Sequence, residues 1–163
     1  MATYDVLNEA AIAATPAEIV DALLAESAGR SRWWQPFLGM RQRGDKPLPE
    51  IGAVVDIVVS VGGLAGRRLA AVRFAARVAA FEPGRRLVLE YFDGDFRGSE
   101  VWTLDPVDTG HTRIVTRWKT DPQGMVRLLA RLADVPGSYS NVMQEGFRGI
   151  ERFTAERKAG SQA

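Results

Sequence analysis

The chain has 163 residues, of which 46% are hydrophobic and 25% are charged, and this composition favours one globular domain over a disordered or fibrous chain. Its 21 lysine and arginine residues are balanced by 20 aspartate and glutamate residues, without a basic block, so nucleic acid is not expected as a partner. The chain has no cysteine, which excludes disulfide bonds, a thiolate nucleophile and a cysteine-based zinc site.

The first ten residues lack a basic stretch followed by an apolar one, and no apolar run approaches the roughly 18 residues of a membrane span. We therefore expect a cytoplasmic protein without integral membrane association.

The N-terminal part of the chain predicts a strand followed by a helix. Residues 3–14 alternate weakly between apolar and polar side chains, as a strand does. Thr15 and Glu18 then have the spacing of a capping box, with proline at the first helical position between them. An apolar stripe at helical spacing continues to Gly29, where we expect this helix to end.

A tryptophan pair follows in residues 31–37, where a serine can cap a helix and a proline prevents a long one, so we expect a single helical turn.

Five or six extended segments come next, separated by short turns that imply antiparallel neighbours. The glycine-rich residues 62–68 indicate a flexible hairpin and not a phosphate loop, because the Lys-Ser/Thr pair is missing. The clearest segments are residues 53–61, 69–81, 87–92, 99–104 and 112–119.

Two helices are predicted at the end of the chain. One begins at Asp121 and carries leucines at the i+3, i+4 and i+7 positions relative to Met125, and residues 136–137 interrupt it. The last begins between Ser138 and Asn141 and closes the sheet. We expect residues 1–158 to form a single domain and residues 159–163 to form a flexible polar tail. The predicted inner face of the last helix carries Met143, Phe147, Ile150 and Thr154.

Several motifs lie in a familiar order: a strand, Thr-Pro-Ala-Glu at 15–18, Arg-Trp-Trp-Gln-Pro at 32–36, the segment 77–87 with its Glu-Pro-Gly-Arg-Arg-Leu end, and a terminal helix. In these features the sequence resembles the polyketide cyclase/dehydrase-like branch of the START/Bet v 1 (SRPBCC) superfamily over nearly its whole length. The resemblance implies an α+β helix-grip fold. In that fold a curved seven-stranded antiparallel sheet wraps around a long C-terminal helix, with two short helices between strands 1 and 2. It also implies a deep cavity for a hydrophobic ligand.

Aromatic residues on four predicted strands are candidates for the wall of that cavity, although an ordinary packed core is the alternative for each. Adjacent tryptophans on a helical turn diverge by roughly 100°, so we expect one to anchor the core and one to lie at the cavity mouth. Gly146 lies within the inner stripe of the last helix, where close packing against the sheet is favoured over space left for ligand. The candidate ligand-binding residues are Trp33, Trp34, Phe74, Tyr91, Trp102, Trp118, Met143, Gly146, Phe147 and Ile150.

Five charged residues lie in apolar strand contexts: Asp56, Glu100, Arg73, Arg77 and Arg117. Because charged side chains are mostly exposed, we expect all five on the convex face. In the alternative arrangement, an inward carboxylate is paired with one of the arginines and the pair serves proton transfer in a cyclase-like reaction.

The only histidine, His111, falls in a predicted hairpin turn, where we expect it to be exposed. We predict no metal and no cofactor, and a catalytic residue cannot be assigned. Three functions remain open. The first is binding of a hydrophobic or amphipathic small molecule, either a lipid or a polyketide-like compound. The second is aromatase/cyclase or dehydratase activity on a polyketide-like substrate. The third is a protein-interaction module.

Overall fold

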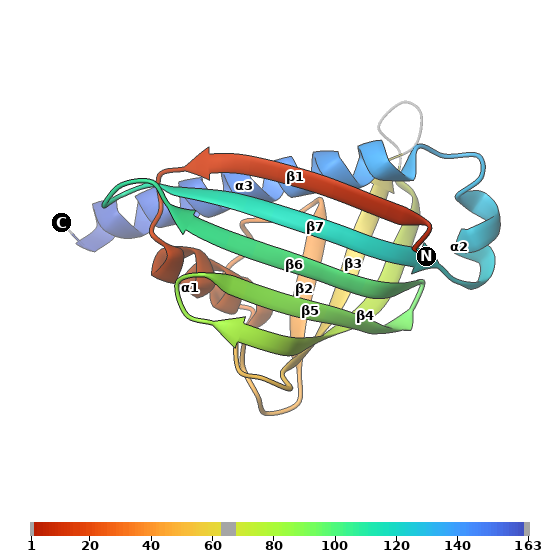
Figure 1. Cartoon of the computed structure of the whole chain (residues 1–163), viewed down its shortest axis with the longest axis horizontal. Helices are drawn as coiled ribbons and strands as arrows, with labels where there is room; N and C mark the ends of the chain where they lie inside the picture. Colours follow the sequence, from red (N-terminus) through yellow and green to blue (C-terminus); the bar gives the residue numbers. More distant parts are fainter. Residues whose placement is uncertain (1, 63–67, 162–163) are drawn as a thin grey trace.

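The computed structural model describes residues 2–62 and 68–161, so most of the predicted glycine-rich hairpin and the last two residues lie outside the described residues. A seven-stranded antiparallel sheet curves beside one long helix, with α1 near one end of the sheet and α2 near the other (Figure 1). The elements in chain order are β1 Tyr4–Ile12, α1 Pro16–Ser27, β2 Leu38–Arg43, β3 Val54–Gly62, β4 Arg68–Glu82, β5 Arg86–Gly94, β6 Phe96–Pro106, β7 Thr112–Pro122, α2 Gly124–Leu129 and α3 Val135–Ser161.

The strands from β2 to β7 pair with their chain neighbours, and β1 returns to pair with β7, which gives the order β1-β7-β6-β5-β4-β3-β2. All six strand pairs are antiparallel, as the short predicted turns require. The structure therefore confirms the α+β helix-grip fold with seven strands and a long C-terminal helix.

The start of α1 follows the predicted capping box. The Glu18 amide donates to the Thr15 hydroxyl at 3.2 Å, and the Thr15 amide donates to a Glu18 carboxylate oxygen at 2.9 Å. The helix ends just before Gly29, whose φ of 75° lies in the left-handed region that glycine adopts without strain. Local sequence signals thus place both ends of α1.

The second short helix predicted before β2 is not formed. Residues 33–37 make a hydrogen-bonded turn instead, in which the Phe37 amide donates to the Trp34 carbonyl at 3.1 Å. The neighbouring Pro36 has no amide hydrogen to continue a helical ladder. The single helix between the first two strands is therefore α1.

The start of α3 differs from its prediction. The helix begins at Val135, with Pro136 in its first turn, where a missing amide hydrogen has no consequence. Asp134 caps this end, because its carboxylate accepts from the Gly137 amide at 3.0 Å. The predicted interruption at residues 136–137 is thus a helix start, and the described part of the predicted tail, up to Ser161, is helical.

The apolar stripe predicted to begin at Met125 does not enter the core. Within the described residues α2 is six residues long and has no buried side chain, and the side chain of Met125 is 72% exposed. Leu132, beyond the end of α2, is 90% exposed. The apolar residues at helical spacing therefore lie on an exposed face at the end of the sheet.

The inner face of α3 is buried as predicted, with Met143, Phe147, Ile150 and Thr154 all in the core. Gly146 and Gly149 let α3 approach the tryptophan turn closely. A Cβ atom on Gly146 would lie 2.5 Å from Cε2 of Trp34, and one on Gly149 would lie 2.5 Å from the Trp33 carbonyl oxygen. Close packing of Gly146 is thus confirmed, but its neighbour is the indole of Trp34 and not the sheet.

Candidate functional site

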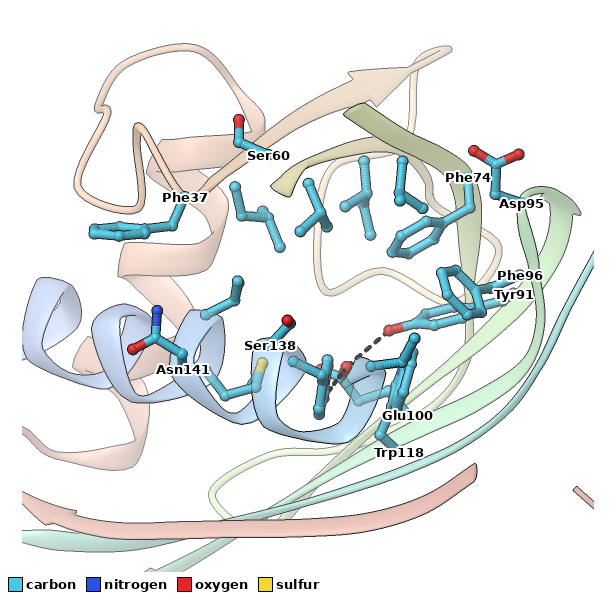
Figure 2. Close-up of a pocket in the computed structure, with 18 of the residues that line it drawn as sticks. Phe37, Ser60, Phe74, Tyr91, Asp95, Phe96, Glu100, Trp118, Ser138 and Asn141 are labelled. Carbon is cyan, nitrogen blue, oxygen red and sulfur yellow. Dashed lines mark hydrogen bonds between the residues drawn. The ribbon is translucent and has the colours of Figure 1, made fainter. Parts of the chain in front are cut away.

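A cavity of about 910 Å³ separates α3 from the concave face of the sheet. Its wall is mainly apolar and draws side chains from all the strands β2 to β7 and from α3, among them Leu38, Ile57, Phe74 and Val142. Figure 2 shows Phe37 and Asn141 on one side of this space and Phe74, Phe96 and Trp118 on the other. The residues of α2 and the α2–α3 connection, including Met125 and Leu129, also border it.

The structure brings six of the ten predicted ligand residues together in the cavity wall and places the other four in the packed core behind it. Among the described residues, the lining does not include those four, so their predicted ligand contact has no support from the geometry. The lining residues are Trp34, Phe74, Tyr91, Trp102, Trp118 and Met143, and the buried residues behind them are Trp33, Gly146, Phe147 and Ile150.

The tryptophan pair does not diverge as predicted. Because the two residues lie in a turn and not in a helix, their rings stack at 5.1 Å with planes 14° apart, and both are buried. The Trp33 indole donates to the Ala22 carbonyl at 2.7 Å, and the Trp34 indole donates to the Val142 carbonyl at 2.9 Å. The turn thereby links α1 to α3, and the edge of Trp34 becomes cavity wall.

Glu100 is the polar centre of the site. The expectation that it faces water is wrong, because its side chain is 4% exposed on the concave face of β6. Its Oε2 accepts from the hydroxyls of Tyr91 at 2.7 Å and Tyr139 at 2.6 Å, and its Oε1 accepts from the indole of Trp102. Three donors thus replace the arginine partner that sequence reasoning required for an inward carboxylate.

Burial raises the pKa of Glu100, and the hydrogen bonds from Tyr139, Tyr91 and Trp102 act in the opposite direction. The pKa values of the Tyr91 and Tyr139 hydroxyls are raised well above the ordinary tyrosine value, first by burial and then by the charge of Glu100. Both tyrosines therefore remain neutral hydroxyl groups beside the carboxylate at physiological pH.

Sequence reasoning missed Tyr139, although a signal was present. It precedes Met143 by four residues and so extends the inner stripe of α3 by one turn. Its ring stacks on Trp118 at 4.1 Å with planes 10° apart, and Trp118 in turn lies 5.2 Å from Phe96. An aromatic wall therefore surrounds the Glu100 cluster.

The other four charged candidates face outward, as predicted. Asp56 pairs with Arg43, Arg77 lies 3.0 Å from Glu90, and Arg117 lies 2.7 Å from Asp5. The fourth, Arg73, is exposed on β4. These pairs are half exposed and lie on the convex face, where water screens the attraction between the charges.

His111 is exposed in the turn between β6 and β7, as predicted, with Nδ1 2.9 Å from a carboxylate oxygen of Asp108. The described lining of the cavity does not include it. The polar groups gathered at Glu100 are therefore its carboxyl group, the two phenols of Tyr91 and Tyr139 and the indole N–H of Trp102.

Several solved structures share this fold. An aromatase/cyclase, Zhui from Streptomyces sp. R1128, has a TM-score of 0.66 at 12% identity, with 94% of each chain covered. The solution structure of KanY (ms6282) has a TM-score of 0.65 at 15% identity, covering 95% of this chain and 99% of that one. A conserved protein from Geobacillus kaustophilus has a TM-score of 0.66 at 15% identity, covering 94% and 96%.

Identities this low show a shared fold and nothing of a shared activity. No protein-family model matches the sequence, and no significant match to a curated protein was found. Within residues 2–62 and 68–161, no helix is both long and apolar enough to cross a membrane.

Proposed function

We propose that this chain is a member of the SRPBCC superfamily that binds a hydrophobic small molecule, lipid or polyketide-like, between its sheet and α3. The observation that carries the proposal is the cavity itself. Its volume of about 910 Å³ lies within the roughly 300 to 1,000 Å³ of known small-molecule sites, and its wall is mainly apolar. Burial of ligand surface at about 25 cal/mol per Å² supplies the affinity, and the Glu100 cluster orients the ligand.

A second candidate function is aromatase/cyclase or dehydratase activity, which the inward position of Glu100 favours. A buried carboxylate in contact with the hydroxyls of Tyr91 and Tyr139 has the groups needed to move a proton to or from a bound substrate. An exposed tryptophan at the cavity mouth would support the protein-interaction alternative, but Trp33 and Trp34 are both buried.

The binding proposal is tested with two matched tryptophan substitutions on β3. Val59 lines the cavity, whereas its neighbour Val58 pairs with Arg73 and points to the convex face. Val59→Trp is expected to weaken uptake of the fluorescent probe N-phenyl-1-naphthylamine by at least about tenfold, because the indole occupies ligand space. Val58→Trp is expected to leave uptake unchanged.

Thermal unfolding of both variants, followed by circular dichroism, controls for loss of structure. Absence of probe uptake by the wild-type protein, or equal uptake by the two folded variants, would contradict the proposal.

A further inference from the structure

The charged residues that line the cavity all carry the same sign. Among the described lining residues these are Asp95, Glu100 and Asp134, and that part of the lining has no lysine, arginine or histidine. Transfer of an anionic group from water to such a wall is unfavourable, because the apolar surroundings do not solvate the charge and the acidic residues repel it.

The hydroxyl and indole hydrogens around Glu100 already take part in hydrogen bonds to its carboxylate. Tyr91 and Tyr139 each have one hydroxyl hydrogen, and both donate it to Oε2 of Glu100. The indole of Trp102 donates to Oε1. With Glu100 ionised, the remaining hydrogen-bonding capacity of this cluster consists of lone pairs on the two phenol oxygens and on Oε1, so a ligand group that binds there donates.

An indole donor lies beside these acceptors. Trp118 is 2% exposed and lines the same cavity, and its indole N–H has no hydrogen-bond partner of good geometry among the described residues. It lies near enough to the Tyr91 hydroxyl to lower the pKa of that group slightly against the dominant effect of burial. A buried donor without an acceptor is unfavourable by about 1 to 3 kcal/mol, and a ligand oxygen would relieve this.

We propose that this end of the cavity binds the hydroxyl group of a hydrophobic alcohol or phenol, and that carboxylate and phosphate lipids are excluded. A hydroxyl group donates to the Glu100 cluster and accepts from Trp118 with the same oxygen. An ether cannot donate, an ammonium group cannot accept, and a carboxylate cannot donate and is repelled. The inference rests on the proposed binding function and specifies its ligand class.

Three pyrene compounds of nearly equal size test this inference by fluorescence titration: 1-pyrenemethanol, its methyl ether 1-(methoxymethyl)pyrene, and 1-pyrenecarboxylate at pH 7.5. The alcohol is expected to bind the wild-type protein roughly five- to tenfold more tightly than the ether, the value of one hydrogen bond. The carboxylate is expected to bind at least about thirtyfold more weakly than the alcohol.

Equal affinity for all three compounds, or a preference for the carboxylate, would overturn the inference while leaving the binding function intact. Failure of all three compounds together with N-phenyl-1-naphthylamine would overturn the binding function and this inference with it.

Two variants test whether Glu100 and Tyr91 cause the preference for the alcohol. Glu100→Gln removes the charge and keeps an acceptor for Trp102, so the alcohol-to-carboxylate affinity ratio is expected to fall about tenfold. Tyr91→Phe removes one acceptor oxygen, and the alcohol-to-ether ratio is expected to fall toward one. Glu90→Gln, on the convex face, is the matched control and leaves both ratios unchanged. An unchanged alcohol-to-carboxylate ratio in folded Glu100→Gln would exclude Glu100 as the selective group.

Discussion

Substitution of Gly149 by alanine is expected to lower the free energy of unfolding by about 2 to 3 kcal/mol or more, through overpacking of the contact between α3 and the tryptophan turn. The added Cβ would lie 2.5 Å from the Trp33 carbonyl oxygen, a backbone atom, and 2.8 Å from Cε3 of the same residue. Neither atom has room to retreat, because the Trp33 ring is stacked on Trp34 and its indole is bonded to Ala22.

Gly146→Ala is expected to be destabilising by about 1 to 3 kcal/mol, because its Cβ meets the buried indole of Trp34, which is bonded to Val142. Gly160 provides the control within the same helix. A Cβ there meets nothing within 4 Å, so Gly160→Ala, in the last turn of the helix, is expected to leave stability unchanged or to raise it by up to about 0.5 kcal/mol.

Urea unfolding followed by tryptophan fluorescence measures all three variants. If Gly149→Ala proved as stable as Gly160→Ala, α3 would not lie as close to the turn as described, and the wall of the cavity would be different.

The second large effect concerns Glu26, a buried carboxylate in α1 beneath the tryptophan turn. Glu26 is 2% exposed. Neither of its carboxylate oxygens has a hydrogen-bond partner of good geometry among the described residues. Burial raises the pKa of Glu26 from 4.5 to about 7, against the opposing effects of the nearby Trp33 and Trp34 amides and of Arg32.

The sign of the pH dependence follows from this shift. Between pH 4.5 and about 7 the folded protein holds a proton on Glu26 that the unfolded chain releases, so stability falls as the pH rises through that window. Above pH 7 the full penalty of about 3 kcal/mol applies, since one pKa unit corresponds to about 1.4 kcal/mol.

Glu26→Gln is therefore expected to be more stable than the wild-type protein by about 2 to 3 kcal/mol at pH 8, and by less than about 1 kcal/mol at pH 5. Urea unfolding at both pH values measures this change. Glu50→Gln, at an exposed position, is the control and changes stability little at either pH. Parallel stability curves for the wild-type protein and Glu26→Gln would show that Glu26 is not buried as described.

Features encoded within a few consecutive residues were predictable from the sequence. The capping box at Thr15 and Glu18 fixes the start of α1, and the turn residues between the later strands fix their antiparallel order. These signals are local because each hydrogen bond or turn conformation involves neighbours in the chain, so the fold followed from them together with the family resemblance.

The inward position of Glu100 is also encoded, because strand periodicity here outweighs the general tendency of charged residues to be exposed. Glu100 alternates with Trp102 and Leu104, and both of those residues are buried on the same face of β6. What the sequence did not contain was the identity of the partners. Tyr91 and Tyr139 come from β5 and α3, and only the tertiary fold brings their hydroxyls to one carboxylate.

The tryptophan pair and α2 show two further limits of local patterns. An angle of about 100° between neighbours holds on a helix, and residues 33–37 form a turn in which the two rings stack. Helical spacing from Met125 predicted an apolar stripe on a helix, and its four residues are exposed at the end of the sheet. Periodicity indicates which residues share a face and not whether another element packs on it.

A crystal structure of the protein with 1-pyrenemethanol tests the central claim most directly, namely that the sheet and α3 enclose a cavity that binds a small hydrophobic molecule. We predict electron density for the pyrene rings between Phe74 and Val142, with the hydroxyl group next to Tyr91 and Glu100. A structure in which α3 packs directly onto the sheet without an intervening cavity, or in which the compound lies on the outer surface, would contradict the claim.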